Sequence, residues 1–218
     1  MAHVNTLQFV SASVAAYRHN GNKVYRELTD QIQHTNKTLI LSLMGEATPA
    51  LLSITDDDKA HAKVIIDDIL QRHTMSLLTG KKMPDFTMQV LNCIKEETTS
   101  PRLIGYITWV PSLFDKLQAA DAKDHQLSVH TYSSKYLGKL KDKIELDFVA
   151  IEERFSTQYN CWRYTGHDTK GNLIGFFRKE KLSGTGMPIR IKGNVKAHET
   201  SKSTKGNTTY LNYVKELK

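Results

Sequence analysis

An alternating sequence, Ile189-Arg190-Ile191-Lys192-Gly193-Asn194-Val195-Lys196-Ala197-His198, lies near the end of this chain of 218 residues. Its odd-numbered positions are small or apolar, and its even-numbered positions are polar and mostly cationic. Successive side chains of a β-strand point to opposite faces, so the pattern predicts a strand with one apolar and one basic side. Such a strand suits a small barrel that holds a polyanion on its outer surface.

Four further strands are predicted around this one, over residues 144–150, 159–165, 173–178 and 208–217. The sequence Asp168-Thr169-Lys170-Gly171-Asn172 predicts a tight hairpin turn, whereas residues 182–188 and 199–207 read as polar loops. Five strands, with a hairpin between the second and third and a long basic loop between the fourth and fifth, follow the order of an OB-fold.

Residues 1–130 are expected to be mainly helical. Apolar residues at helical spacing predict a helix over residues 22–35, whereas the short apolar run at 39–45 does not distinguish helix from strand. Thr55 before three aspartates is a typical helix N-cap, and Gly80 is a typical stop, with Val64, Ile65, Ile69 and Leu70 as the expected apolar stripe.

The remaining helix signals come from prolines. Pro84 and Asp85 open a helix whose expected apolar face carries Phe86, Val90, Leu91 and Ile94, and Ser100 with Pro101 predicts another helix start. Pro111 is expected to end or kink that helix, and residues 118–134 read as a fraying helix followed by a linker. The predicted fold class is therefore α+β, with a mainly helical domain (residues 1–130) followed by a five-stranded OB-fold β-barrel (residues 131–218).

Composition supports a folded, basic protein. Hydrophobic residues make up 39% of the chain and the net charge is +7. Residues 134–218 hold 17 of the 30 Lys and Arg but 9 of the 23 Asp and Glu, a net charge of +8, and residues 1–133 have a net charge of −1. Such asymmetry is typical of a nucleic-acid-binding half joined to a half with another role.

The cysteines and the N-terminus indicate in which cell compartment the protein is expected. Cys93 and Cys161 form no CxxC motif and no zinc-ligand set, and we expect free thiols in a reducing cytosol. The N-terminus lacks the pattern of a signal peptide and no apolar run could span a bilayer, so a cytoplasmic protein without membrane contact is expected.

The predicted barrel also resembles a known family. The segments Ser134–Gly138, Lys143–Leu146, Asp168–Asn172 and Ile189–Glu199 are similar to the C-terminal OB domain of many tailed-phage proteins. Residues 78–86 and the Pro111 segment also resemble the helical part of some of them. The resemblance implies binding of single-stranded DNA in phage replication, recombination or repair, within the host cytoplasm.

Residue types in the barrel favour the same function. Single-strand binders need cations along the backbone and aromatic faces on which bases stack, with about 1–3 kcal/mol per stacked base. The candidate contacts are aromatic and cationic residues of the predicted strands and loops: Arg154, Phe155, Tyr159, Trp162, Arg163, Tyr164, Phe176, Arg178, Lys179, Arg190, Lys192, Lys196, Lys202, Lys205 and Tyr210.

Alternation limits how many of these side chains face outward. Only one of Phe176 and Phe177 can do so, and Tyr210 and Tyr213 fall on opposite faces. Trp162 and Tyr164 share a face opposite Arg163 and are equally compatible with the core or the surface. Lys202 and Lys205 are predicted contacts because the loop between the fourth and fifth strands lines the binding face of OB-folds.

The sequence gives only weak signals of a metal site or a catalytic site. The aspartates at 56–58 with His61 could suggest a metal site, but a helix N-terminus explains them better. Cys161, His167 and Asp168 lie within one hairpin, which argues against a nucleophilic site, and no phosphate-binding P-loop motif is present. We therefore expect no enzyme activity, no cofactor and no metal.

The sequence thus predicts a non-enzymatic single-stranded DNA-binding protein with little sequence preference. The helical half is expected to contact a replication or transcription protein or another copy of the chain. Two other functions stay open: an interaction module or inhibitor that docks on a host or phage polymerase or nuclease, and an RNA-binding protein.

Overall fold

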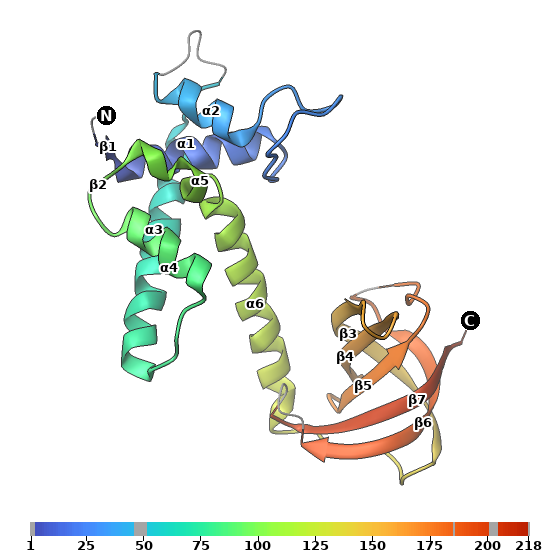
Figure 1. Ribbon diagram of the computed structural model, residues 1–218. Coiled ribbons are helices and arrows are strands. Elements are labelled where there is room, and N and C mark those ends of the chain that lie inside the picture. The colour runs from blue at the N-terminus through green and yellow to red at the C-terminus, as the bar shows by residue number, and fades with distance from the viewer. Residues whose placement is uncertain (1–2, 46–51, 185, 201–204, 218) are drawn as a thin grey trace. The chain divides into compact units, whose positions relative to one another are not determined.

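The N-terminal part of the chain is helical and the C-terminal part is a β-barrel (Figure 1). The computed structural model describes residues 3–45, 52–184, 186–200 and 205–217. Contacts divide the chain into two units, Met1–Gln118 and Ala119–Lys218. This division falls within a helix, whereas the sequence suggested a boundary between residues 130 and 131.

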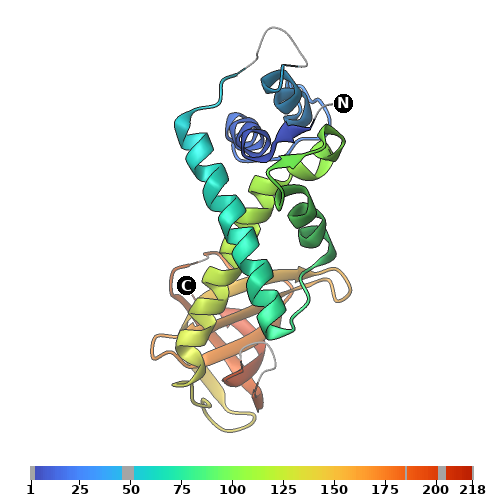
Figure 2. The ribbon, with the colours of Figure 1, turned by 90° about the vertical axis from the view of Figure 1, so that its left-hand side faces the viewer.

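The first unit is built around one buried helix. Its elements are β1 (Val4–Asn5), α1 (Thr6–His19), α2 (Asn36–Leu43), α3 (Asp56–Thr79), α4 (Asp85–Ile94), β2 (Thr98–Thr99), the 3₁₀ helix η1 (Pro101–Leu103), α5 (Ile104–Ile107) and the start of α6 (Val110–Thr131). Helix α1 packs against α2 and α3 (Figure 2), and β1 pairs antiparallel with β2. Small and apolar residues of α1 from Phe9 to Ala16 are all buried, so this helix is the centre of the helical core.

The prediction of a helix over residues 22–35 is wrong. Gly21 and Asn22 adopt left-handed backbone angles, with φ of 64° and 59°, and these end α1. The loop that follows is held by Asn36, whose side chain accepts from the Tyr25 backbone N–H and donates to the Lys23 carbonyl oxygen. The sequence missed α1 because its Ala and Ser residues are buried on all sides and give no amphipathic period.

The termini of α3 confirm the capping prediction. The Thr55 hydroxyl accepts from the Asp58 backbone N–H, the Asp58 carboxylate accepts from the Thr55 N–H, and Gly80 ends the helix with a φ of 68°. Asp58 also pairs with Arg18 at 2.9 Å. Burial opposes ionisation of Asp58, but the hydrogen bonds from Arg18 and Thr55 lower its pKa overall. Val64, expected in the apolar stripe, is exposed.

Two prolines stand at the starts of helices in this unit. Ser100 caps η1 and Pro101 is its first residue, as predicted. The helix predicted after Pro101 ends at Ile107, before Pro111. Pro111 is the second residue of the next helix, α6, where a missing N–H costs nothing, so it also opens a helix, which was not expected of it. Helix α6 then continues to Thr131, through the stretch that was expected to fray.

The second unit contains a closed barrel of five strands, as the sequence predicted. They are β3 (Lys143–Ser156), β4 (Cys161–Asp168), β5 (Leu173–Arg178), β6 (Ile189–Thr200) and β7 (Asn207–Glu216), in the closed order β3-β4-β5-β7-β6. Strands β5 and β7 are parallel, and the other neighbours are antiparallel. This order is that of an OB-fold-like barrel, and the fold class is α+β.

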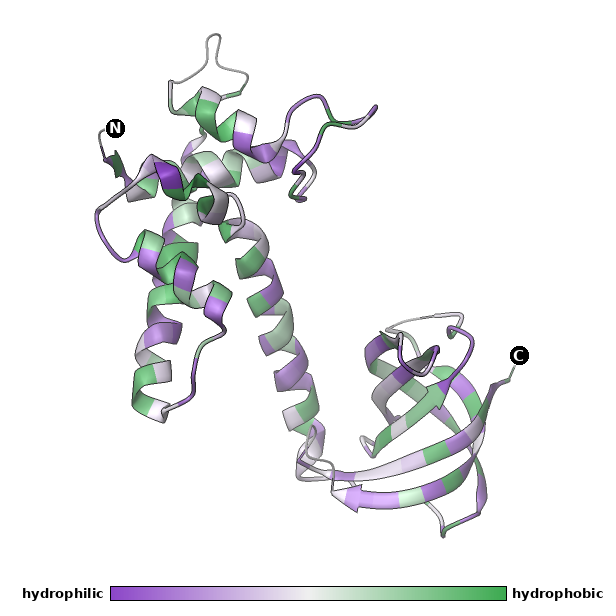
Figure 3. Cartoon of the chain, viewed as in Figure 1, coloured by the Kyte–Doolittle hydropathy of each residue, from purple (hydrophilic) through white to green (hydrophobic). Residues whose placement is uncertain are grey.

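Apolar side chains that point inward from the strands fill the inside of this barrel. Hydrophobic and hydrophilic residues alternate along most of β6 (Figure 3), and the inward-facing residues of the strands form a core that includes Phe148, Tyr164, Phe176 and Ile191. The predicted turn joins β4 to β5, where the Asp168 carboxylate accepts from the backbone N–H groups of Lys170 and Asn172.

The segment after α6 is fastened to the barrel by hydrogen bonds. The Ser134 hydroxyl accepts from the Leu173 N–H and donates to the Asn207 carbonyl oxygen. Near the end of α6, the ring of His130 stacks on His167 of β4 with 4.1 Å between the ring centroids. Within the described ranges, no helix has both the length and the apolar character needed to cross a membrane.

Candidate nucleic-acid interface

An open groove of about 400 Å³ runs over the outer face of β4, β5, β7 and β6. Its exposed and half-buried lining comprises two cations, one carboxylate, three aromatic rings, one amide and one alanine: Arg163, Lys196, Glu199, Phe177, Tyr210, Tyr213, Asn212 and Ala197. We call this hollow the β7 groove. Four of the residues that the sequence singled out line it, namely Arg163, Lys196, Tyr210 and the buried Phe176.

The β4–β5 hairpin sets one wall of the groove. Its register pairs Arg163 with Phe177, so these two side chains share the outer face, whereas the Tyr164–Phe176 pair points into the core. Gly175 pairs with Tyr210 across β5 and β7. A Cβ atom at position 175 would lie 2.7 Å from Cε1 of Tyr210, so glycine leaves the room that this ring occupies.

Two β-bulges set the opposite wall. Between β6 and β7 the pairing shifts at Lys196, since Val195 pairs with Leu211 but Ala197 pairs with Tyr210. Lys196 and Ala197 therefore both line the groove, and the alternation predicted through His198 ends here. His198 is half-buried instead, and its ring stacks on Tyr136 at 4.7 Å.

The second bulge lies on β7. Lys192 pairs with Lys215 and Asn194 with Asn212, so Tyr213 and Val214 stand opposite Gly193 alone. Leu211 and Val214 are buried, and Asn212 and Tyr213 between them both line the groove. The expectation that Tyr210 and Tyr213 face opposite ways is corrected, because the bulge adds a residue to the strand.

A second hollow, of about 580 Å³, adjoins the β7 groove and shares Phe177 and Tyr213 with it. Its lining also includes Lys179 and Lys215, which are both exposed. Exposed rings therefore stand between two hollows. The second hollow is lined by three cations (Arg178, Lys179 and Lys215) and by the carboxylates of Glu180 and Glu216.

Several cations on other parts of the barrel are paired with carboxylates. On β6, Arg190 pairs with Asp147 at 3.2 Å and Lys192 pairs with Glu145, and both partners lie directly across on β3. The hydrogen bond and charge of Lys192 lower the pKa of Glu145. The basic row of β6, expected to contact DNA, thus forms cross-strand ion pairs at these two positions.

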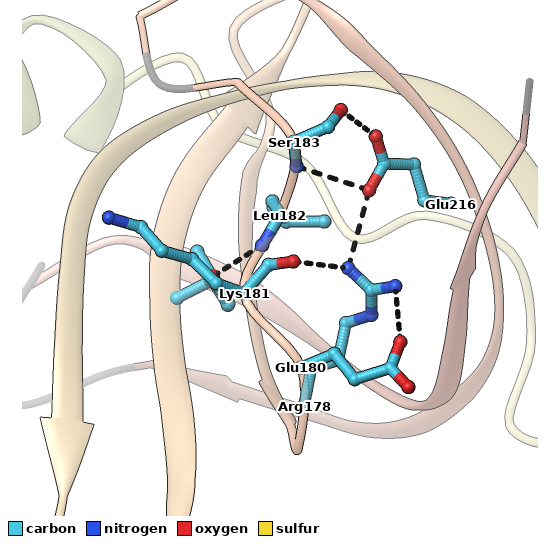
Figure 4. Close-up of polar contacts among 7 residues, drawn as sticks. Arg178, Glu180, Lys181, Leu182, Ser183 and Glu216 are labelled. Atoms are coloured by element: carbon cyan, nitrogen blue, oxygen red, sulfur yellow. Dashed lines mark hydrogen bonds and ion pairs between the residues drawn. The ribbon is translucent and has the colours of Figure 1, made fainter.

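Arg178 also makes ion pairs and hydrogen bonds within the barrel (Figure 4). Its guanidinium donates to Glu216 and Glu180 and to the Lys181 carbonyl oxygen. Glu216 in turn accepts from Ser183, and this hydrogen bond contributes most to lowering the pKa of Glu216. These contacts fasten the β5–β6 connection to β7, so Arg178 has a structural role.

Five of the predicted cations differ from these residues, because they have no carboxylate partner among the described residues. Within the described part of the chain, no ion pair engages Arg154, Arg163, Lys179, Lys196 or Lys205. Arg163 and Lys196 lie in the β7 groove, and Lys179 lies in the adjoining hollow. Lys205 is exposed just before β7, and Lys202 lies outside the described residues.

Two of the aromatic predictions are corrected by burial. Tyr164 is 0% exposed and Phe176 is 1% exposed, so neither ring has a face available to a base. Burial raises the pKa of the Tyr164 hydroxyl, which accepts a hydrogen bond from the Leu182 N–H. Phe177 takes the outward position that had been assigned to Phe176.

Three other aromatic predictions, Phe155, Tyr159 and Trp162, lie at the β3–β4 hairpin. Phe155 meets Trp162 edge to face at 5.2 Å, and the Lys181 ammonium lies 5.1 Å from the Trp162 ring centroid. Arg154 and Tyr159 are exposed nearby on the same hairpin. None of these four predicted residues lines the β7 groove.

The residues considered for other chemistry have structural surroundings. Asp58 is used by Arg18 and the α3 cap, and His61 contacts the Phe114 ring. Cys161 is buried, His167 stacks on His130, and Asp168 holds the β4–β5 turn. In the residues that the structure describes, no group of three or more His, Cys, Asp or Glu could hold a metal ion.

Sequence reasoning missed Phe177, Asn212 and Tyr213. The predicted turn at residues 168–172 could have identified Phe177, because it fixes a register in which Phe177 pairs with Arg163. No sequence pattern marks the bulge at Tyr213. Comparisons with protein-family models, with curated proteins and with solved structures find no match to this chain.

Proposed function

We propose that the barrel binds single-stranded DNA with little sequence preference, through the β7 groove. The observation that carries the proposal is the distribution of ion pairs over the barrel surface. Arg163 and Lys196 have no carboxylate partner among the described residues and flank exposed rings, whereas Arg190 and Lys192 are neutralised across the strand. An unpaired cation is available to replace the counterions of a phosphate.

The mechanism is neutralisation of the backbone combined with base stacking. Arg163 and Lys196 contact phosphates from opposite walls of the groove, and the rings of Phe177 and Tyr210 contact bases. No hydrogen-bond reading of a base edge is required, so the binding tolerates different sequences. The resemblance of the barrel segments to phage DNA-binding domains supports a role in replication, recombination or repair.

Two double variants test this proposal with the same change of net charge. We expect Arg163→Ala with Lys196→Ala to weaken binding of a single-stranded oligonucleotide and to reduce the salt slope by about two, roughly one per lost phosphate contact. Arg190→Ala with Lys192→Ala removes the same residue types from the paired face and should leave affinity close to that of the unmodified protein. Fluorescence titrations at several salt concentrations measure both.

Two outcomes would contradict the proposal. Equal losses in both double variants would mean that overall charge, and not the groove, sets the affinity. Weak binding at low salt without a salt slope would exclude a phosphate-based interface altogether. Competition between DNA and RNA oligonucleotides of one sequence shows which nucleic acid is preferred.

A further inference from the structure

Two exposed aromatic rings stand at the border between the β7 groove and the adjoining hollow. Phe177 is 50% exposed and Tyr213 is 79% exposed, and both line both hollows. Over the described ranges, neither ring contacts another aromatic ring. These two rings are therefore exposed to solvent where the two hollows meet, without stacking on each other.

The backbone of Tyr213 is strained. Its φ of 54° lies in the left-handed region, which bulky residues rarely adopt and which glycine or asparagine occupies more readily. Within the described part of the chain, no hydrogen bond engages the Tyr213 side chain, and its ring is mostly exposed, so the fold gains little from tyrosine here. A strained residue in a bulge beside a groove is a recurring sign of a functional position.

We infer that Phe177 and Tyr213 form a clamp for one unpaired nucleobase. The base enters between the two rings, and the flanking phosphates lie toward Arg163 and Lys196 on one side and toward Lys179 and Lys215 on the other. A base within a duplex is already stacked and paired, so the clamp selects single strands. This inference rests on the proposed function and adds to it the element that recognises the base.

The alternative is that the bulge serves only the curvature of β7 and that tyrosine at this position is incidental. The two explanations differ in what asparagine would do. If the bulge alone matters, Tyr213→Asn keeps the left-handed backbone and changes nothing in binding. If the ring is required, the variant folds as before and loses affinity.

The experiment compares Tyr213→Asn with Tyr132→Asn in the full chain. Tyr132 is an exposed tyrosine outside both hollows, which makes it a matched control. The probes are a short oligothymidylate and an abasic oligonucleotide of the same length. We expect Tyr213→Asn to bind oligothymidylate roughly 5- to 100-fold more weakly, as for the loss of one stacked base, and to bind the abasic probe as well as the unmodified protein does.

The results separate the clamp from the proposed function. Unchanged affinity of Tyr213→Asn for oligothymidylate, or an equal loss on the abasic probe, overturns the clamp, while the Arg163 and Lys196 double variant tests the groove independently. Phe177→Ala should reproduce the base-dependent loss. Melting temperatures accompany each titration; if Tyr213→Asn were unfolded, Tyr213→Gly and Phe177→Ala would decide the outcome in the same way.

Discussion

Phe176 and Phe177 are adjacent in the chain but have opposite surroundings. Phe176 is buried against Phe148 and Tyr164, with ring centroids 5.0 and 5.1 Å away, whereas Phe177 lies on the groove wall. We expect Phe176→Ala to lower the free energy of unfolding by about 3–5 kcal/mol, because it removes core contacts and leaves a cavity. Phe177→Ala should change it by about 0.5 kcal/mol or less, as is usual for surface positions.

Denaturant titration of both variants measures this contrast. The pair also separates stability from binding, since Phe177→Ala is expected to lose affinity while remaining folded. Similar losses of stability in the two variants would show that Phe177 packs into the barrel in solution, and it would then be unavailable to a base.

At single positions, the sequence predicted which residue types are needed but only part of where they point. A period of two separates Tyr164 from Arg163 correctly, yet it cannot tell which face is inside when both carry large side chains. The partners of Arg190 and Lys192 lie more than 40 positions away on β3, and they become visible only when the strands pair. Cross-strand ion pairs therefore distinguish the cations that stabilise the barrel from the cations that are available to bind a ligand.

At the scale of elements, the contact between α6 and β4 predicts a dependence of stability on pH. Burial, and then the neighbouring His167, lower the pKa of His130 below the ordinary value of 6.5, although Asp168 opposes the shift. The unfolded chain therefore binds a proton at His130 more readily than the folded chain does. As a result, stability from this group is fully present above pH 6.5 and falls as the pH drops below that value.

The comparison of His130→Gln with His125→Gln checks this expectation. His125 is exposed on the same helix and provides the matched control. The free energy of unfolding, measured by denaturant titration at several pH values below 7, should depend less on pH in His130→Gln than in the unmodified protein. Identical pH profiles for all three proteins would contradict a lowered pKa of His130 in the folded protein.

The elements that the sequence predicted well are those with local signals. Thr55 and Gly80 bound α3 through capping chemistry, and the turn before β5 follows from Asp168 and Gly171. Helix α1 was missed because it is buried all round, and the bulges at Lys196 and Tyr213 were missed because they interrupt the period that reveals strands. Such interruptions are set by the closure of the barrel, which no single strand encodes.

At the scale of the whole molecule, the described residues form two separate hydrophobic cores. One is formed by helices of the first unit and includes Ile65 of α3, and the other is the barrel core and includes Ile191 of β6. Both isoleucines are 0% exposed. The cations and rings assigned to binding all belong to the barrel unit, so a ligand should stabilise that unit in particular.

Calorimetric unfolding of Ile65→Ala and Ile191→Ala, with and without single-stranded DNA, tests this assignment. Each substitution should cost about 2–5 kcal/mol in its own core. A ligand at about 100 times its Kd stabilises the unit that binds it by about 2.7 kcal/mol, so the DNA should raise the transition that Ile191→Ala lowers. The transition lowered by Ile65→Ala should stay in place, and this variant should keep its affinity for DNA. Helix α6 continues from one unit into the other. If the protein instead unfolds in a single transition, and DNA raises the temperature of that transition, the helix couples the two cores and binding also stabilises the helical unit.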